Sequence, residues 1–218
     1  METKKKPLGK ILIFLLFGLA IVWVIILSRA KYTIGTMPKL GEKNISINGD
    51  TIYHQIDTFT LKSQFGTNFG SDSLKGKIYL ANFFFTSCPE VCPAINSNIN
   101  LIQLKFKEVN DVMFVSFTVD PETDTFQKLA EYAAKYGKPS NWRFLTGPKF
   151  KIYDLAEYSY LSISHGASKA NWAHTELLTL IDETGKIRGV YEGRGDQRVI
   201  NEIIDGIKLL RIEKQNKK

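Results

Sequence analysis

The stretch Ile78–Phe85, IYLANFFF, and the segment Thr86–Pro93 that follows it, TSCPEVCP, decide the fold and the chemistry of this chain. The first is a nearly continuous apolar run of strand length, which is typical of a strand buried on both faces of a sheet. Apolar residues then recur at helical spacing between residues 95 and 106. We therefore predict a buried strand that leads into a helix, with the Cys-Pro segment at the junction.

The same alternation of strand and helix patterns continues along the chain. The predicted elements are a buried strand over 112–119, an amphipathic helix over 125–136, a strand over 142–146, a helix over 148–158, a hairpin of 176–181 with 187–191, and a helix over 197–212. The order is βαβαβα followed by ββα. It predicts an α/β domain whose mixed sheet is flanked by helices.

The N-terminus predicts a membrane anchor. Residues 11–27 are 17 uncharged, nearly all apolar residues preceded by four lysines, and this length is at the short end of what spans a bilayer. The lysines favour a cytoplasmic N-terminus, which places the rest of the chain on the periplasmic or outer side of the inner (cytoplasmic) membrane. A cleaved signal peptide is the alternative, because Ser28–Ala30 resembles a cleavage site. The run is longer than a typical h-region, however, which favours one uncleaved transmembrane helix.

Composition and charge give the remaining organisation. We expect a basic tip and anchor over 1–30, a polar tether over 31–50, one domain over 51–212 and a basic tail over 213–218. The formal charge of +7 lies at the two ends, since the terminal segments 1–10 and 208–218 carry +3 and +4 and the charges between them cancel. A nucleic-acid-binding surface is therefore not expected.

The chemistry converges on Cys88 and Cys92, which are the only cysteines of the chain. A helix N-terminus favours thiolate over thiol, and a spacing of four puts both sulfurs on one face if the turn is helical. The pair can be a structural disulfide, a redox dithiol or a soft metal site. A disulfide across so short a loop stabilises little, and redox dithiols are usually spaced Cys-x-x-Cys. Copper suits the pair best, because soft thiolates select Cu(I) and a histidine would add a ligand acceptable to Cu(II).

Three histidines are candidates for that third ligand. His54 lies in the first strand region after the tether and is expected to be structural or at the surface. His165 and His174 lie within or at the end of the loop before the hairpin, and His174 directly precedes a buried strand. Our preference for His174 rests largely on the resemblance described below. Among nearby acids, we expect Asp120 to end a strand, with a role near the metal as the alternative. Asp124 is expected to cap the helix that starts near Thr125, and Glu90 to be a solvated acid at a helix start.

Several segments of the chain resemble the Sco (SenC) family of copper chaperones of cytochrome c oxidase assembly. The matching segments are Phe83–Pro93 (FFFTSCPEVCP), Phe117–Thr125 (FTVDPETDT), Trp142–Gly147 (WRFLTG), and His174 ahead of Leu180–Gly185 (LIDETG). The resemblance covers about residues 50–210 and implies a thioredoxin-like fold. It also implies one copper ion, Cu(I) or Cu(II), bound by Cys88, Cys92 and His174.

The function implied by this resemblance is assembly of the dinuclear copper centre of cytochrome c oxidase. Its partners would be the copper-bearing oxidase subunit and other copper-assembly proteins, and its role would be copper delivery rather than catalysis. The alternative is a membrane-anchored thiol–disulfide oxidoreductase with Cys88 and Cys92 as the redox pair. Thioredoxin-like oxidoreductases place a cis-proline before the hairpin strand that faces the cysteines, whereas this chain has no proline after Pro148. The copper chaperone is therefore the preferred interpretation.

Overall fold

The computed structural model describes residues 15–24, 35–162 and 176–217 of the 218-residue chain. The chain divides into two compact units, Met1–Gly35 and Thr36–Lys218. In the first unit, residues 15–24 are helical. No helix within the described ranges is long and apolar enough to cross a membrane. The predicted anchor over 11–27 extends beyond the described residues at both of its ends.

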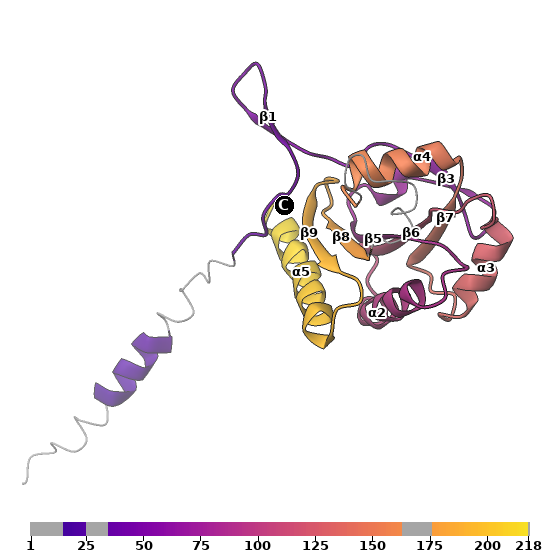
Figure 1. Ribbon diagram of the computed structural model, residues 1–218. Coiled ribbons are helices and arrows are strands. Elements are labelled where there is room, and N and C mark those ends of the chain that lie inside the picture. Colours follow the sequence, from indigo (N-terminus) through magenta and orange to yellow (C-terminus); the bar gives the residue numbers. More distant parts are fainter. Residues whose placement is uncertain (1–14, 25–34, 163–175, 218) are drawn as a thin grey trace, which may run out of the picture. The chain divides into compact units, whose positions relative to one another are not determined.

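The second unit is built on a seven-stranded mixed sheet (Figure 1). The strands are β3 (Thr60–Ser63), β4 (Asn68–Gly70), β5 (Ile78–Phe84), β6 (Val112–Thr118), β7 (Trp142–Thr146), β8 (Leu177–Ile181) and β9 (Ile187–Glu192). Their spatial order is β4-β3-β7-β6-β5-β8-β9. The central strands β5, β6 and β7 are parallel, and the outer strands pair antiparallel. The predicted mixed sheet is confirmed, with β3 and β4 added at one edge.

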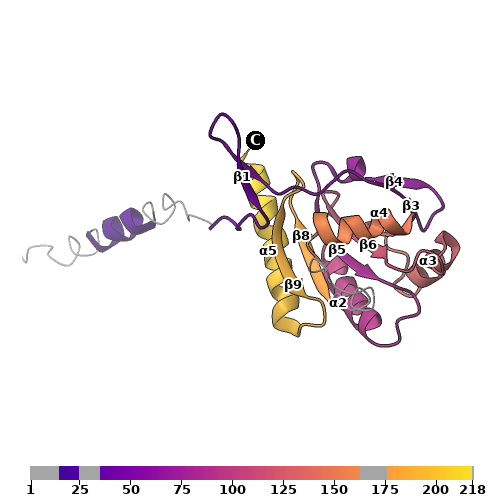
Figure 2. The same cartoon turned by 45° about the horizontal axis from the view of Figure 1, so that its top comes forward.

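Helices cover both faces of this sheet (Figures 1 and 2). They are α2 (Val91–Lys105), α3 (Phe126–Ala134), α4 (Lys149–Asp154), which continues as the π-helical turn η2 (Leu155–Ser159), and α5 (Gln197–Asn216), together with the short 3-10 helix η1 (Ser71–Leu74). Helices α2, α3 and α5 contribute to one hydrophobic core, and α4 with η2 to the other. The layered α/β arrangement predicted from the pattern is therefore present.

The two central strands are buried along their whole length, as their unbroken apolar sequences predict. Alternate side chains of β5 enter opposite cores, because successive residues of a strand point to opposite faces. Ile78, Leu80 and Phe84 pack with α2 and α5, whereas Tyr79, Ala81 and Phe83 pack with η2. This burial fixes the end of β5, and with it the start of the loop that carries the cysteines.

The predicted tether and tail are more structured than the sequence pattern indicates. Residues 43–53 form a separate two-stranded sheet of β1 (Lys43–Ile45) and β2 (Thr51–Tyr53). The backbone oxygens of Met37 and Pro38 accept hydrogen bonds from the buried guanidinium of Arg188. Helix α5 continues to Asn216 rather than ending at residue 212. The β1–β2 sheet rests on its own backbone pairing, whereas residues 37–38 and Glu213 of α5 contact Arg188, a long-range partner that local periodicity does not report.

Candidate metal centre

The two cysteines lie side by side between β5 and α2. Cys88 is in the turn after Phe84, and Cys92 is in the first turn of the helix. Both are free thiols, 9% and 4% exposed. The backbone N–H of Cys92 donates to the Cys88 sulfur at 3.3 Å. The predicted junction is confirmed, but Cys88 precedes the helix, so regular helical spacing does not describe the pair.

Burial governs the acidity of the second thiol. It raises the pKa of Cys92 to about 12, and a hydrogen bond with Cys88 and the negative charge of Asp124 act in the same direction. The expectation that the helix N-terminus favours thiolate is therefore wrong for Cys92 without a metal. Loss of hydration of the charged form outweighs the favourable end of the helix dipole.

Asp124 anchors the start of the cysteine loop. Its carboxylate is completely buried and accepts hydrogen bonds from the Thr86 N–H at 2.9 Å, the Thr86 hydroxyl, and the Thr118 hydroxyl at 2.6 Å. The Lys128 ammonium lies 3.7 Å away. The prediction that Asp124 caps the next helix is wrong, because the side chain of Thr125 accepts the capping bond from the Lys128 N–H.

The role of Asp124 depends on strand pairing. Phe84 and Thr118 are partners in the parallel β5–β6 register, so the segments after the two strands meet at one edge of the sheet. Asp124 joins them across 38 residues of sequence. Thr86 and Asp124 were both visible in the sequence, but their contact follows from the register of β5 and β6.

The other singled-out acids and His54 have local roles. Asp120 closes the turn after β6: its N–H donates to the Thr118 hydroxyl at 3.0 Å, and its carbonyl accepts from the Asp124 N–H at 2.8 Å. Glu90 is exposed at the N-cap of α2, and its side chain makes no capping bond. The ring of His54 contacts the carbonyl oxygen of Ser159 at 2.6 Å, in agreement with the predicted structural role.

Comparison with known proteins identifies the family. The SCO1/SenC family model matches residues 50–208, which is most of the chain. The chain belongs to the SCO1/SenC family. The SCO1 protein homolog of Bacillus subtilis is 34% identical over 148 residues, which cover 66% of this chain and 77% of that protein.

Two solved structures of Sco proteins show the same fold. BsSco, described as a member of the Sco family of cytochrome c oxidase assembly proteins with a disulfide switch, is 32% identical. It covers 73% of this chain and 94% of its own, with a TM-score of 0.62. ScoI of Bradyrhizobium japonicum, solved with copper bound, is 25% identical, covers 71% and 98%, and has a TM-score of 0.57. The predicted thioredoxin-like fold is confirmed.

Two of the three histidines weighed as the third ligand, with His174 the predicted one, remain to be placed. His165 and His174 lie within 163–175, outside the described residues. Among the residues that the structure does describe, no three His, Cys, Asp or Glu side chains are grouped closely enough to hold a metal ion. The described part of the chain therefore offers two candidate ligands, Cys88 and Cys92.

Proposed function

We propose that this protein is a membrane-anchored copper chaperone that holds one copper ion through Cys88, Cys92 and His174. It delivers the ion to the dinuclear copper centre of cytochrome c oxidase, with the copper-bearing oxidase subunit as its partner. The observation that carries the proposal is the pair of buried free thiols, with the Cys92 N–H in contact with the Cys88 sulfur.

The donor set fits copper. Two adjacent sulfur ligands select Cu(I), and an imidazole adds a donor that Cu(II) accepts. Because burial favours the neutral thiol at Cys92, binding a metal there requires loss of a proton. The buried site also limits contact of the sulfurs with water and oxidants, as suits a protein that carries copper as cargo.

The topology of β8 supports His174 as the third ligand. Strand β8 begins at Leu177, three residues after His174. It pairs antiparallel with β5, and Ala81 lies opposite Thr179. The chain therefore enters β8 at the edge of the sheet where β5 ends and the cysteine loop begins.

A thiol–disulfide function is the second candidate, and the contact between the two cysteines favours it as an accompanying activity. The disulfide switch named for BsSco supports the same chemistry in a relative that is 32% identical. Two thiols that form a disulfide are unavailable as thiolate ligands, so oxidation should block copper uptake and reduction should restore it.

The membrane anchor is part of the proposal. The lysine cluster before residue 11 and the apolar run over 11–27 support a single-pass anchor in the inner membrane, with the domain on its periplasmic or outer side. Mass spectrometry of the N-terminus of the native protein tests it. A mature chain that begins at Lys31 would show that the run is instead a cleaved signal peptide.

Copper titration of the full-length protein in detergent tests the ligand set. Cys88→Ser and Cys92→Ser should each weaken Cu(I) and Cu(II) binding and abolish the sulfur-to-Cu(II) charge-transfer band. His174→Ala should weaken Cu(II) far more than Cu(I), because two thiolates alone satisfy the softer ion. His165→Ala is the matched control and should do little. A folded His174→Ala protein with unchanged copper stoichiometry and spectrum would contradict the three-ligand site.

A further inference from the structure

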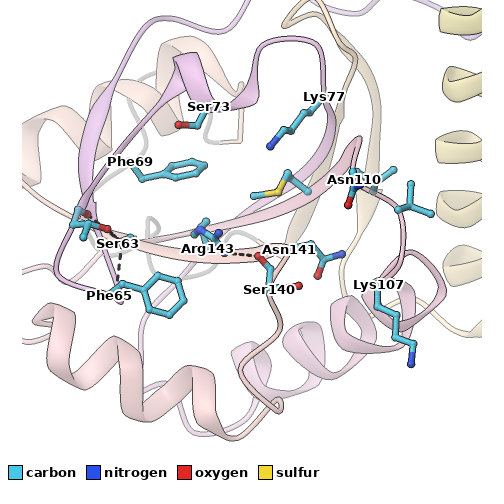
Figure 3. A pocket seen from close by; sticks show the side chains of 14 residues that line it. Ser63, Phe65, Phe69, Ser73, Lys77, Lys107, Asn110, Ser140, Asn141 and Arg143 are labelled. Carbon is cyan, nitrogen blue, oxygen red and sulfur yellow. Dashed lines mark hydrogen bonds between the residues drawn. The ribbon is translucent and has the colours of Figure 1, made fainter.

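A polar cavity, shown in Figure 3, lies at the opposite end of the sheet from the cysteines. Its volume is about 540 Å³, within the range of small-molecule sites. Lys77, at its wall, directly precedes β5, whereas Cys88 follows that strand. Seven strand residues separate the two ends by about 20 Å. The cavity is therefore separate from the proposed copper site.

The charge of the cavity wall is entirely positive. Among the described residues that line it, three are basic and none is acidic. The basic residues are Lys77, Lys107 and Arg143, and the polar neutral ones include Ser73, Asn110, Ser140 and Asn141. A concave surface lined in this way attracts anions and offers hydrogen-bond donors to them.

Arg143 is at the centre of this wall. Figure 3 shows it between Phe65 and Phe69, whose ring centres lie 5.2 and 5.9 Å from the guanidinium carbon. Nη1 donates to the carbonyl oxygens of Ser140 at 2.7 Å and Trp142 at 3.3 Å. No carboxylate pairs with this half-buried guanidinium in the described part of the chain, and burial lowers its pKa. Burial of a cation without an anion costs free energy, which a bound anion would recover.

Lys77 adds a second positive charge to this site. Figure 3 shows the Lys77 side chain extending into the cavity, and no ion pair engages its ammonium within the described ranges. Lys107 points outward at the rim, 3.9 Å from Glu108. Asn141 is 7% exposed, and its side-chain oxygen has no hydrogen-bond partner among the described residues. This oxygen is a hydrogen-bond acceptor, so its missing partner is a donor and not the anion itself.

We propose that this cavity binds a small polyvalent oxyanion, a phosphate ester or a polycarboxylate, through Arg143 and Lys77. The planar guanidinium suits two-point contact with such a group, and the ammonium of Lys77 supplies a second charge across the cavity. A small molecule fits better than an acidic protein segment, because the unpaired charges face the inside of a cavity and do not extend along the surface.

Isothermal titration of the metal-free, full-length protein in non-ionic detergent tests this proposal. Sodium pyrophosphate and citrate are the two probes, at low ionic strength. At least one should bind with 1:1 stoichiometry, and Arg143→Gln should weaken that binding about tenfold or more, since a charge-assisted contact is lost. Lys77→Gln should weaken it as well. Arg198→Gln, at an exposed position on α5 that pairs with Glu202, is the matched control and should bind normally.

The outcomes separate the ligand classes. Tighter binding of pyrophosphate supports a phosphate ester, and tighter binding of citrate supports a polycarboxylate. The proposal fails if neither probe binds at millimolar concentration, or if folded Arg143→Gln and Lys77→Gln proteins both bind like the wild type. If Arg143→Gln does not fold, Lys77→Gln decides, because the Lys77 side chain makes no hydrogen bond or ion pair with the residues that the structure describes.

Discussion

Two buried carboxylates in this domain are stabilised in different ways. Asp182, after β8, forms an ion pair with the buried Arg188 at 3.0 Å and accepts hydrogen bonds from Thr184 and from the Lys186 N–H. Asp124, near the cysteines, is held mainly by neutral N–H and O–H donors, with the Lys128 ammonium at 3.7 Å. The charge of Asp182 is balanced by the buried cation of Arg188, whereas the charge of Asp124 is stabilised mainly by hydrogen bonds.

The two carboxylates also connect different parts of the chain. The Asp182–Arg188 pair extends to Glu213 of α5 at 2.7 Å and to the backbone of residues 37–38, so it fixes both ends of the domain's chain to the sheet. Asp124 joins the cysteine loop to the end of β6, and its negative charge adds to the burial that raises the pKa of Cys92. The comparison indicates that one network serves stability and the other positions the thiols.

The largest expected effect is from Arg188→Met. It leaves the carboxylates of Asp182 and Glu213 without their buried cation, which should lower the free energy of unfolding by about 3–5 kcal/mol. Urea unfolding of the full-length protein measures this. Arg198→Met on the exposed face of α5 is the control and should change stability by less than about 0.5 kcal/mol. A loss below about 1 kcal/mol at Arg188 would contradict the stabilising role.

Asp124→Ala should have a smaller effect on stability and a distinct effect on the thiols. The donors on Thr86 and Thr118 lose their acceptor, at a cost of about 1–3 kcal/mol. Because the cysteine loop loses its anchor, the thiols should react faster with an alkylating reagent. Asp124→Asn keeps one acceptor oxygen and should restore part of both properties. Unchanged thiol reactivity in a folded Asp124→Ala protein would refute the positioning role, and Asp72→Ala at the surface is the control.

Acid should weaken the Asp182 network. Burial acts to raise the pKa of Asp182, but hydrogen bonds from Thr184, the Lys186 N–H and Arg188 outweigh it, so the pKa lies below its usual value. As the pH falls, the unfolded state therefore binds a proton at Asp182 before the folded state does. The stabilisation is fully present above about pH 4, and it is lost as the pH falls through the lower pKa that Asp182 has in the folded protein. The difference in unfolding free energy between wild type and Asp182→Asn should therefore shrink on acidification. A difference that is constant from pH 7 to 3 would contradict this.

The smallest expected effect is from Asp111→Asn, at a more exposed ion pair. Arg211 and Lys214 of α5 contact Asp111 at 3.0 and 3.1 Å, and its side chain is 32% exposed. Water and salt screen such pairs, so the loss should be below about 1 kcal/mol and should diminish in 1 M NaCl. A loss as large as that of Arg188→Met would mean that burial does not distinguish the two networks.

The local pattern of the sequence determined the central part of the fold. The apolar runs that became β5 and β6 were long enough to predict burial on both faces, and the structure confirms it. Helix signals were equally local: Thr125 accepts the first bond of α3, and Gly137 after that helix has a φ of +77°. The position of Cys88 and Cys92 between strand and helix followed from the same pattern. Each of these features depends on residues within one turn or one strand.

Only the tertiary structure decided what the polar side chains do. Asp124 looked like a helix cap, Arg188 like an ordinary strand residue, and Arg143 like part of a short strand, until the sheet register brought distant residues against them. Thr86 lies 38 residues from Asp124, and Met37 lies 151 residues from Arg188. A sequence reports burial through the spacing of apolar residues, because that spacing repeats along one element. The partner of a buried charge follows no such period, since it depends on which segments the folded sheet places side by side.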